Sequence, residues 1–318
     1  MLWGDPGAAP PAEFGCVAEG SAVDGIDWDR TVFALVAPDA LVRHVGGDVV
    51  RRMRAEGFTP VGWRPLWRRP AALDAFNERN INQVWKSYLY RLVDRLFAFG
   101  PAIALLMRDD APVAGSSSHD RMRAVKGASQ PELVKAGTIR ADLESTNIML
   151  ALMHSSDTPA ESAQESRVFT GPDWFATGDV ADLWTLLRGM ELGFPQERRG
   201  FEGVLAGVRA RVIGAIWGEL PGPARDLATA LLSGGVADVA AAGAGAKLAD
   251  LLPHPHHPLD PFLRDDFAAH APPDVDQSPV LDIDRAHLLL GGYGVRLDAW
   301  EDIVLATSLR FPPRRAGY

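Results

Sequence analysis

Residues 137–158 of this chain read GTIRADLESTNIMLALMHSSDT. Within them Ile148–Met153 is apolar at every position, which predicts an interior strand of a sheet, buried on both faces. Residues 126–146 are predicted as the loop that leads into this strand, and Pro159–Phe169, after Asp157, begins like a helix. The stretch therefore predicts a loop, an interior strand and a helix, with His154 just past the end of the strand.

The residues before this stretch alternate between strand and helix patterns. Thr31–Val36 is rich in β-forming residues and predicts a short buried strand. Asp39 fits the N-cap of a following helix that ends near Gly57, and the apolar face of that helix recurs every four residues at Leu41, Val45, Val49 and Met53. The next predicted elements are a strand at Thr59–Trp67, a helical segment at Arg68–Phe99, a strand at Pro101–Met107 and a helix at Ser116–Val125.

This order of elements indicates a fold class. Strands separated by helices, with connections of this length, suit an α+β unit with a ferredoxin-like antiparallel sheet and helices on one face. We therefore predict a flexible arm at residues 1–28 and one α+β domain at residues 29–171.

The sequence pattern changes in residues 172–318, where amphipathic helical segments predict a mostly α-helical C-terminal domain of unknown role. The helical patterns lie at Val180–Leu192, Arg199–Leu220, Ala224–Leu232, Val236–Leu252 and Ala286–Leu309. In the second of them the apolar face consists of Phe201, Val204, Leu205, Val208, Val212 and Ile216. These stripes are most simply explained as core.

The bulk composition limits the possible partners. The 318 residues carry a formal net charge of −9, which disfavours non-specific binding to nucleic acid or to an anionic membrane. No apolar run is long enough to cross a bilayer, and the N-terminus lacks the pattern of a signal peptide. We expect a soluble cytoplasmic protein that binds neither nucleic acid nor membrane.

Several segments together are similar to one family. They are Phe33–Leu41, residues 46–58, Gly100–Leu105, the run Gly137–Asp142, and His154–Thr158 followed by Glu161–Ala163. In this order and at this spacing they resemble nucleoside diphosphate kinases over about residues 30–170. The resemblance implies a ferredoxin-like fold and a phosphotransferase in which a histidine relays the terminal phosphate of a nucleotide, with Mg²⁺ bridging the nucleotide phosphates.

The resemblance also implies roles for individual residues. His154 would carry the phosphate, Ser156 would lie near it, and Glu165 is the nearest candidate for the carboxylate that orients the imidazole. The phosphates would be bound by Arg123, Arg140 and Ser129, and the base would stack on Tyr88 or Tyr90. Arg123 could instead be a solvated surface arginine, and the two tyrosines could be ordinary core or surface aromatics.

The chain departs from the family at three positions. Ala37 stands where the family has a lysine that contacts the transferred phosphate, Ala151 replaces the asparagine that binds the sugar hydroxyl, and Ser155 replaces a glycine. Loss of one charge-assisted donor commonly lowers a rate by about 10²–10³. We therefore expect a divergent acceptor, either a nucleotide or a specialised metabolite. The alternatives are a non-catalytic nucleotide-binding or scaffold protein, and an enzyme that uses the same pocket for a different transfer or hydrolysis.

A histidine-rich loop and the oligomeric state remain to be interpreted from the sequence. His254, His256 and His257 lie in a proline-rich loop without accompanying metal-ligand spacing, so we interpret them as a solvated loop and predict no protein metal site. The family usually forms hexamers or tetramers, which implies a homo-oligomer. The helical half could block or replace those contacts.

Overall fold

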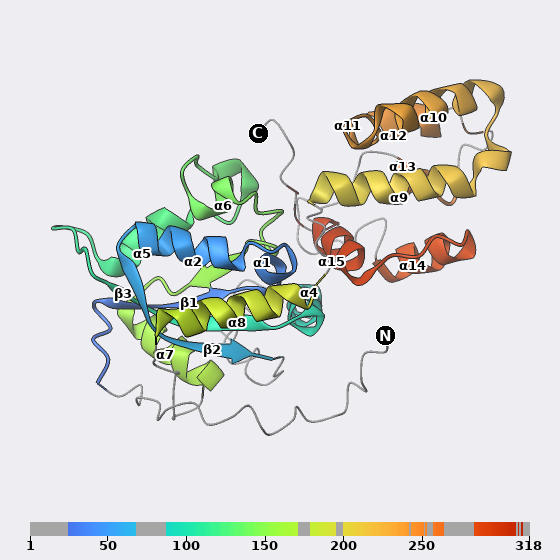
Figure 1. Cartoon of the computed structure of the whole chain (residues 1–318). Helices are drawn as coiled ribbons and strands as arrows, with labels where there is room; N and C mark the ends of the chain where they lie inside the picture. The colour runs from blue at the N-terminus through green and yellow to red at the C-terminus, as the bar shows by residue number, and fades with distance from the viewer. Residues whose placement is uncertain are drawn as a thin grey trace.

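A computed structural model describes residues 25–67, 87–170, 179–194, 200–241, 243–250, 252, 257–263, 283–309, 311 and 313. Its sheet has four antiparallel strands in the order β2-β3-β1-β4, namely β2 (Phe58–Leu66), β3 (Ala102–Asp109), β1 (Thr31–Val36) and β4 (Met153–Ser155). This is the strand order of a ferredoxin-like sheet, so the predicted fold class is confirmed (Figure 1).

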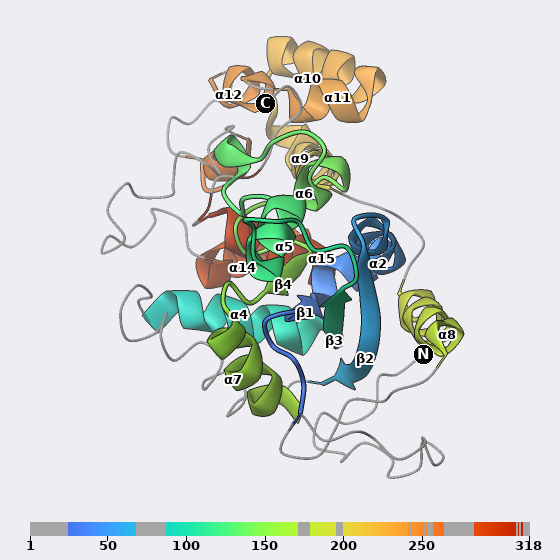
Figure 2. The ribbon, with the colours of Figure 1, turned by 90° about the vertical axis from the view of Figure 1, so that its left-hand side faces the viewer.

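The central strand β1 is buried on both faces because its residues alternate between two apolar clusters. Val32, Ala34 and Val36 belong to the cluster shared with α1 (Pro38–Val42), α2 (Gly46–Ala55) and α8 (Val180–Leu192). Phe33 and Leu35 belong to a cluster on the opposite face, against which Phe97 of α4 (Ser87–Phe99) packs. Figure 2 shows the sheet with α8 on one side and α4 and α7 (Pro159–Thr170) on the other. The expectation that the helices lie on one face is therefore wrong.

The single helix predicted after Asp39 is two helices. The chain breaks between α1 and α2, where His44 has a φ of 54°. The predicted apolar face is nevertheless confirmed across the two helices, since all four of its residues are buried in one cluster: Leu41, Val45, Val49 and Met53. An apolar interval of four residues reports which side faces the core, and it does not show that the backbone between is continuously helical.

The predicted strand at Ile148–Met153 is also wrong, because only Met153–Ser155 is extended. Leu150 and Leu152 are buried, as the apolar run requires, but Leu152 has a φ of 68°. Side chains take over the hydrogen bonds that a ladder would have made. Asn147 Oδ1 accepts from the main-chain N–H groups of Met149 and Leu150, and Asp39 Oδ2 accepts from that of Leu152.

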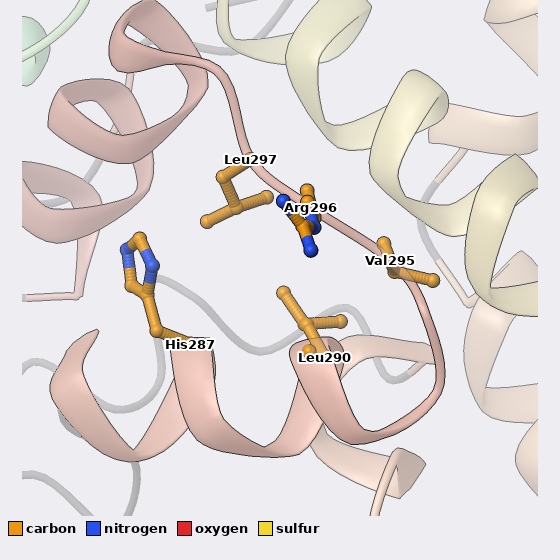
Figure 3. Close-up of a pocket in the computed structure, with 6 residues that line it drawn as sticks. His287, Leu290, Val295, Arg296 and Leu297 are labelled. Atoms are coloured by element: carbon orange, nitrogen blue, oxygen red, sulfur yellow. The ribbon is translucent and has the colours of Figure 1, made fainter.

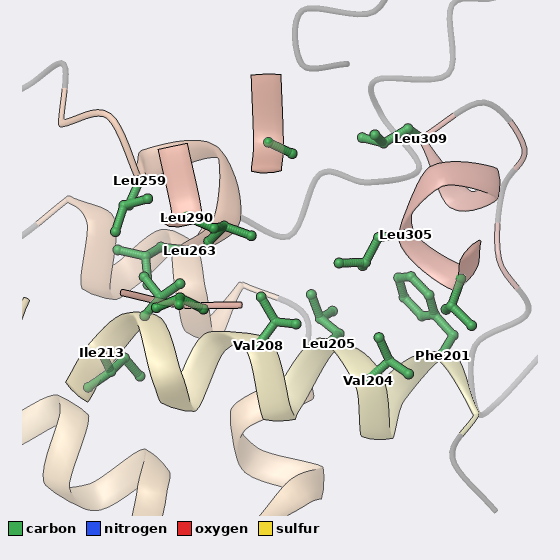
Figure 4. Close-up of a cluster of buried hydrophobic side chains, with 14 of the residues drawn as sticks. Phe201, Val204, Leu205, Val208, Ile213, Leu259, Leu263, Leu290, Leu305 and Leu309 are labelled. Atoms are coloured by element: carbon green, nitrogen blue, oxygen red, sulfur yellow. The ribbon is translucent and has the colours of Figure 1, made fainter. Parts of the chain in front are cut away.

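The second half is helical, as predicted. After α8 come α9 (Phe201–Ala215), α10 (Gly222–Gly234), α11 (Val236–Ala240), α12 (Ala244–Ala249), α13 (Asp260–Leu263), α14 (Ile283–Gly292) and α15 (Ala299–Ser308). Two 3₁₀ turns, at Pro131–Leu133 and Trp217–Glu219, and the helices α5 (Ser118–Lys126) and α6 (Ile139–Asp142) complete the described elements. The predicted face of α9 is confirmed, and Figure 4 shows it directed towards leucines of α13, α14 and α15.

The two halves share buried side chains. Leu183 and Leu187 of α8 lie in the cluster of the sheet, whereas Val42, Leu96 and Leu150 lie in the cluster of the helical half. Asn147 donates to Thr307 Oγ1 at 2.8 Å, and the ring of Phe99 lies 5.8 Å from that of Trp300. The boundary at residue 171 stays a prediction, and apolar packing crosses it. No helix in the described ranges has the length and apolarity to cross a membrane.

Candidate functional site

His154 lies on β4 at the edge of the sheet, opposite Leu35 of β1. Its Nε2 is 2.9 Å from Glu165 Oε2 on α7, and Ser156 Oγ donates to the same carboxylate oxygen at 2.5 Å. The histidine side chain is 38% exposed and the glutamate 17%. The structure therefore brings three of the predicted residues into one hydrogen-bonded group that a solvent-borne molecule can reach. Their catalytic roles stay a prediction.

This contact fixes how the imidazole can act. An ionised carboxylate only accepts hydrogen bonds, so the partner nitrogen of a neutral imidazole must be the protonated one. Nε2 then carries the proton and donates to Glu165, and Nδ1 carries the lone pair. The arrangement is that of a nucleophile whose tautomer and orientation are set by a neighbouring acid.

The sequence between β4 and α7 explains why Glu165 reaches the histidine. Ser156 N–H donates to Phe33 O and continues the pairing with β1. Thr158 Oγ1 accepts from Glu161 N–H while Glu161 Oε2 accepts from Asp157 N–H, which starts α7 close to the strand end. Glu165 follows Glu161 by four residues and so lies on the same side of the helix, one turn later.

Arg140 is buried and holds main-chain carbonyl groups around the site. Its Nε donates to Ala151 O at 3.0 Å, Nη1 to Gly127 O at 2.8 Å and Nη2 to Met153 O at 2.7 Å. Burial lowers the pKa of the guanidinium to about 10. These bonds brace the strand that carries His154. The predicted contact of Arg140 with phosphate stays a prediction.

The other predicted phosphate ligands lie in different surroundings. Arg123 is 57% exposed and pairs with Asp120 one turn earlier on α5. Ser129 Oγ lies 3.4 Å from Gln130 Oε1 in the loop after α5. Tyr88 and Tyr90 are in the first turns of α4, but their side chains lie outside the described residues. The interpretation of Arg123 as a surface arginine fits its ion pair with Asp120, and the hydrogen bonds of Arg123 and Ser129 run to neighbours in the chain.

Lys126 belongs to the site and was not predicted. Its side chain, at the end of α5, is only 9% exposed, and Nζ donates to the carbonyl oxygen of Ser155 at 3.1 Å. Nζ also lies 3.7 Å from Asp157 Oδ1. Burial, with a contribution from Arg140, lowers the pKa of the ammonium to about 8. A signal existed in the sequence, since Lys126 follows the buried Met122 by four residues and so shares its helix face.

Asp39 links the first strand to the segment before His154. It is fully buried, its Oδ2 accepts from Leu152 N–H at 2.9 Å, and burial raises the pKa of its carboxyl to about 6. The cations Arg43 and Arg140 oppose this rise but do not overcome it. The predicted N-cap role is replaced by this tertiary contact, because α1 begins one residue earlier, at Pro38.

We expect the buried Asp39 to make stability depend on pH. The folded chain binds this proton more tightly than the unfolded chain, so the free energy of unfolding is largest below the unfolded pKa of 3.8 and falls as the pH rises through about 6. Two pKa units correspond to about 3 kcal/mol. Urea unfolding of wild type and Asp39→Asn at pH 4 and pH 7 should show that the wild type loses most of this free energy of unfolding relative to the variant.

Asp226→Asn, at an exposed position of α10, is the control for this measurement, and its difference from wild type should not change with pH. A pH-independent difference between wild type and Asp39→Asn would contradict the assignment.

A magnesium ion at this site would depend mainly on its substrate. Within the described part of the chain no three His, Cys, Asp or Glu side chains gather to hold a metal ion. Mg²⁺ is commonly bound by nucleotide phosphates with one or two carboxylates and several waters.

A separate pocket lies in the helical half and shares no residue with this site. It has a volume of about 190 Å³ and is lined by six residues of α14 and the following segment: His287, Leu290, Gly291, Val295, Arg296 and Leu297 (Figure 3). His287 on its wall is bound to Asp302 at 2.8 Å. This second acid–imidazole pair differs from that of His154, because Asp302 also accepts a hydrogen bond from Arg95 Nη1 at 3.3 Å.

Comparison with known proteins gives a consistent result for the first half of the chain. A family model described as nucleoside diphosphate kinase matches residues 29–174. The chain is 31% identical over 157 residues to a nucleoside diphosphate kinase of Synechococcus sp. (strain WH7803), covering 49% of this chain and 91% of that protein. It is 30% identical over 141 residues to that of Geotalea daltonii, covering 44% and 94%.

Solved structures with a similar fold were also found. The nucleoside diphosphate kinase of Halobacterium salinarum, in complex with CDP, aligns with a TM-score of 0.40 and 22% identity, over 49% of this chain and 97% of that one. The enzyme of Encephalitozoon cuniculi aligns with a TM-score of 0.40 and 17% identity, over 49% and 98%.

Proposed function

The chain belongs to the nucleoside diphosphate kinase family, and we propose that it is a phosphotransferase that relays a phosphoryl group through His154. The observation that carries the proposal is the bond between His154 Nε2 and Glu165 on a side chain that remains 38% exposed. A structural histidine at a strand edge has no need of a partly buried carboxylate that is itself held by a serine hydroxyl.

The chemistry proceeds in two halves. Nδ1 of His154 attacks the terminal phosphorus of a nucleoside triphosphate, a P–N bond forms, the P–O bond to the leaving diphosphate breaks, and the diphosphate departs. The Nε2 proton stays in its bond to Glu165, whose charge stabilises the positive imidazole. An acceptor oxygen then attacks the phosphorus, a P–O bond forms, the P–N bond breaks, and its electron pair returns to Nδ1 of His154. A phosphate oxygen of a nucleotide attacks as the anion, whereas a hydroxyl acceptor would release its proton to water. Bound Mg²⁺ supplies charge neutralisation on the phosphates.

The acceptor is proposed to differ from the family's usual one. Ala37 and Ala151 offer no polar side chain, and their main-chain groups are engaged, since Ala37 N–H donates to Leu152 O and Ala151 O accepts from Arg140. Contacts to the phosphate and to the sugar hydroxyl must therefore come from other residues or be absent. We infer a nucleotide or a specialised metabolite as acceptor. A cytoplasmic location and a homo-oligomeric state stay predictions.

Incubation of the protein with γ-labelled ATP and Mg²⁺ tests this function. We expect about one label per chain, stable in alkali and lost in acid, located in the peptide that contains His154, and transferred to an added nucleoside diphosphate. Each chain should release one ADP in a first turnover, which is the signature of a covalent intermediate. The absence of any label under conditions in which ATP binds would contradict the proposal.

Ala37 favours a second candidate, a nucleotide-binding protein without turnover. Such a protein would bind ATP with no phosphoenzyme and with no release of ADP. The labelling experiment separates the two functions, because both predict nucleotide binding and only the first predicts a covalent product.

A further inference from the structure

The site proposed above has a missing charge. Phosphoryl transfer relies mainly on positioning and on positive charge near the phosphate oxygens. Position 37, on the loop beside β4, holds alanine, and Arg140 already directs Nε, Nη1 and Nη2 to carbonyl oxygens of the main chain. These bonds use three of the five N–H donors of Arg140, so a cation from another element would add the charge that position 37 lacks.

Lys126 is a cation beside the reacting residue. Its ammonium lies 3.1 Å from the carbonyl oxygen of Ser155, the residue directly after His154. It approaches from α5, which packs against both β1 and β4. An ammonium has three N–H donors, so the bond to Ser155 and the pair with Asp157 leave a third for a phosphate oxygen.

The surroundings of Lys126 compensate its charge poorly. Burying an ammonium is costly unless a counter-charge is close and well placed. Arg140 repels it, while Asp157 is half exposed and therefore screened by water, and Glu165 is already bound to His154 and Ser156. The lowered pKa of about 8 reports this imbalance. A bound polyphosphate would supply the missing negative charge.

We propose that Lys126 is a catalytic residue that contacts the phosphoryl group on its way to His154, in the role that Ala37 cannot fill. The inference rests on the proposed function. The lysine keeps its protons throughout, and it neutralises charge on the phosphoryl oxygens while the bond to the leaving diphosphate breaks and the bond to Nδ1 forms. The class of ligand that it recognises is the terminal phosphate of a nucleoside triphosphate.

The test measures single-turnover labelling by γ-labelled ATP in four proteins: wild type, Lys126→Met, Lys126→Arg and the control Lys247→Met. Lys247 is an exposed lysine on α12 in the helical half, and its replacement should leave the rate at the wild-type value. We expect Lys126→Met to label about 10²–10³ times more slowly. Lys126→Arg should retain part of the rate, because a guanidinium keeps the charge and can still bond to Ser155.

A pH profile separates chemistry from structure. The groups that face Lys126 are Arg140 from α6, Asp157 from the turn before α7 and Glu165 from α7. In wild type, labelling at low ATP should fall as the pH rises through about 8, when the free enzyme loses this charge. In Lys126→Arg that alkaline fall should disappear, whereas a lysine that only braces the turn would leave the profile unchanged.

The outcomes distinguish the two proposals. Labelling of Lys126→Met at the wild-type rate, with wild type labelled on His154, would overturn the role of Lys126 alone. No label in the wild type would overturn both. If Lys126→Met does not fold, as judged by circular dichroism, the arginine variant decides, and an unchanged alkaline fall in it would overturn the role.

Discussion

Glu165→Gln is expected to slow phosphorylation of His154 by about 10²–10⁴, more than Glu165→Ala does. A glutamine at this place can donate its N–H to Nε2, which favours the tautomer with the proton on Nδ1. That tautomer has no lone pair on the attacking nitrogen. Alanine removes the orienting contact but does not favour the tautomer with the proton on Nδ1. Water can then accept the hydrogen bond from Nε2 in place of Glu165.

Rapid-quench measurement of label against time would check this expectation for Glu165→Gln, Glu165→Ala and Ser156→Ala. His154→Ala supplies the baseline, at which no label forms. Ser156→Ala removes one of the two hydrogen bonds to Glu165 Oε2, and it should lower the labelling rate less than either change at Glu165 does. Glutamine and wild type labelling at equal rates would show that the acid neither sets the tautomer nor stabilises the charged imidazole.

A chain that ends at residue 174 is expected not to fold, although it contains the whole segment that matches the family model. It would lack Leu183 and Leu187, which complete the apolar cluster on one face of the sheet. Val42, Leu96 and Leu150 would lose the cluster that covers them, and Asn147 would lose Thr307 and Ser308. A small domain has a net stability of only about 5–15 kcal/mol, which losses of this kind exceed.

Thermal unfolding followed by circular dichroism would check this, and the shortened chain should show no cooperative transition. Two substitutions in the full chain form a matched pair for the contribution of α8. Replacing Leu187, which is 1% exposed, by aspartate should lower the free energy of unfolding by about 4 kcal/mol or more. The same replacement at Leu192, which is 61% exposed on the same helix, should lower it by about 0.5 kcal/mol or less. A cooperative transition at the temperature of the full chain would show that the first half is independent.

The sequence by itself determined the elements whose signal is local. The continuous apolar run of β1 predicted burial on both faces, and the apolar stripe of α9 predicted which side of that helix faces a core. The motif around His154 also pointed to Glu165 as its neighbour, whereas the strand that carries His154 lies at the edge of the sheet and not in its interior as predicted. The apolar pattern also predicted burial of residues 148–153, which holds for residues 150–153, whereas Ile148 and Met149 are only partly buried.

Only the tertiary structure decided how those buried residues are arranged. Residues 148–152 are not a strand because Asn147 and Asp39, one of them remote in the chain, satisfy their main-chain groups. Lys126 was not predicted, Arg140 was predicted only as a phosphate ligand, and the burial of both depends on α5, α6 and β4 meeting. Whether a buried charge destabilises the fold or serves a site depends on the groups around it in space. A sequence does not show which groups these are.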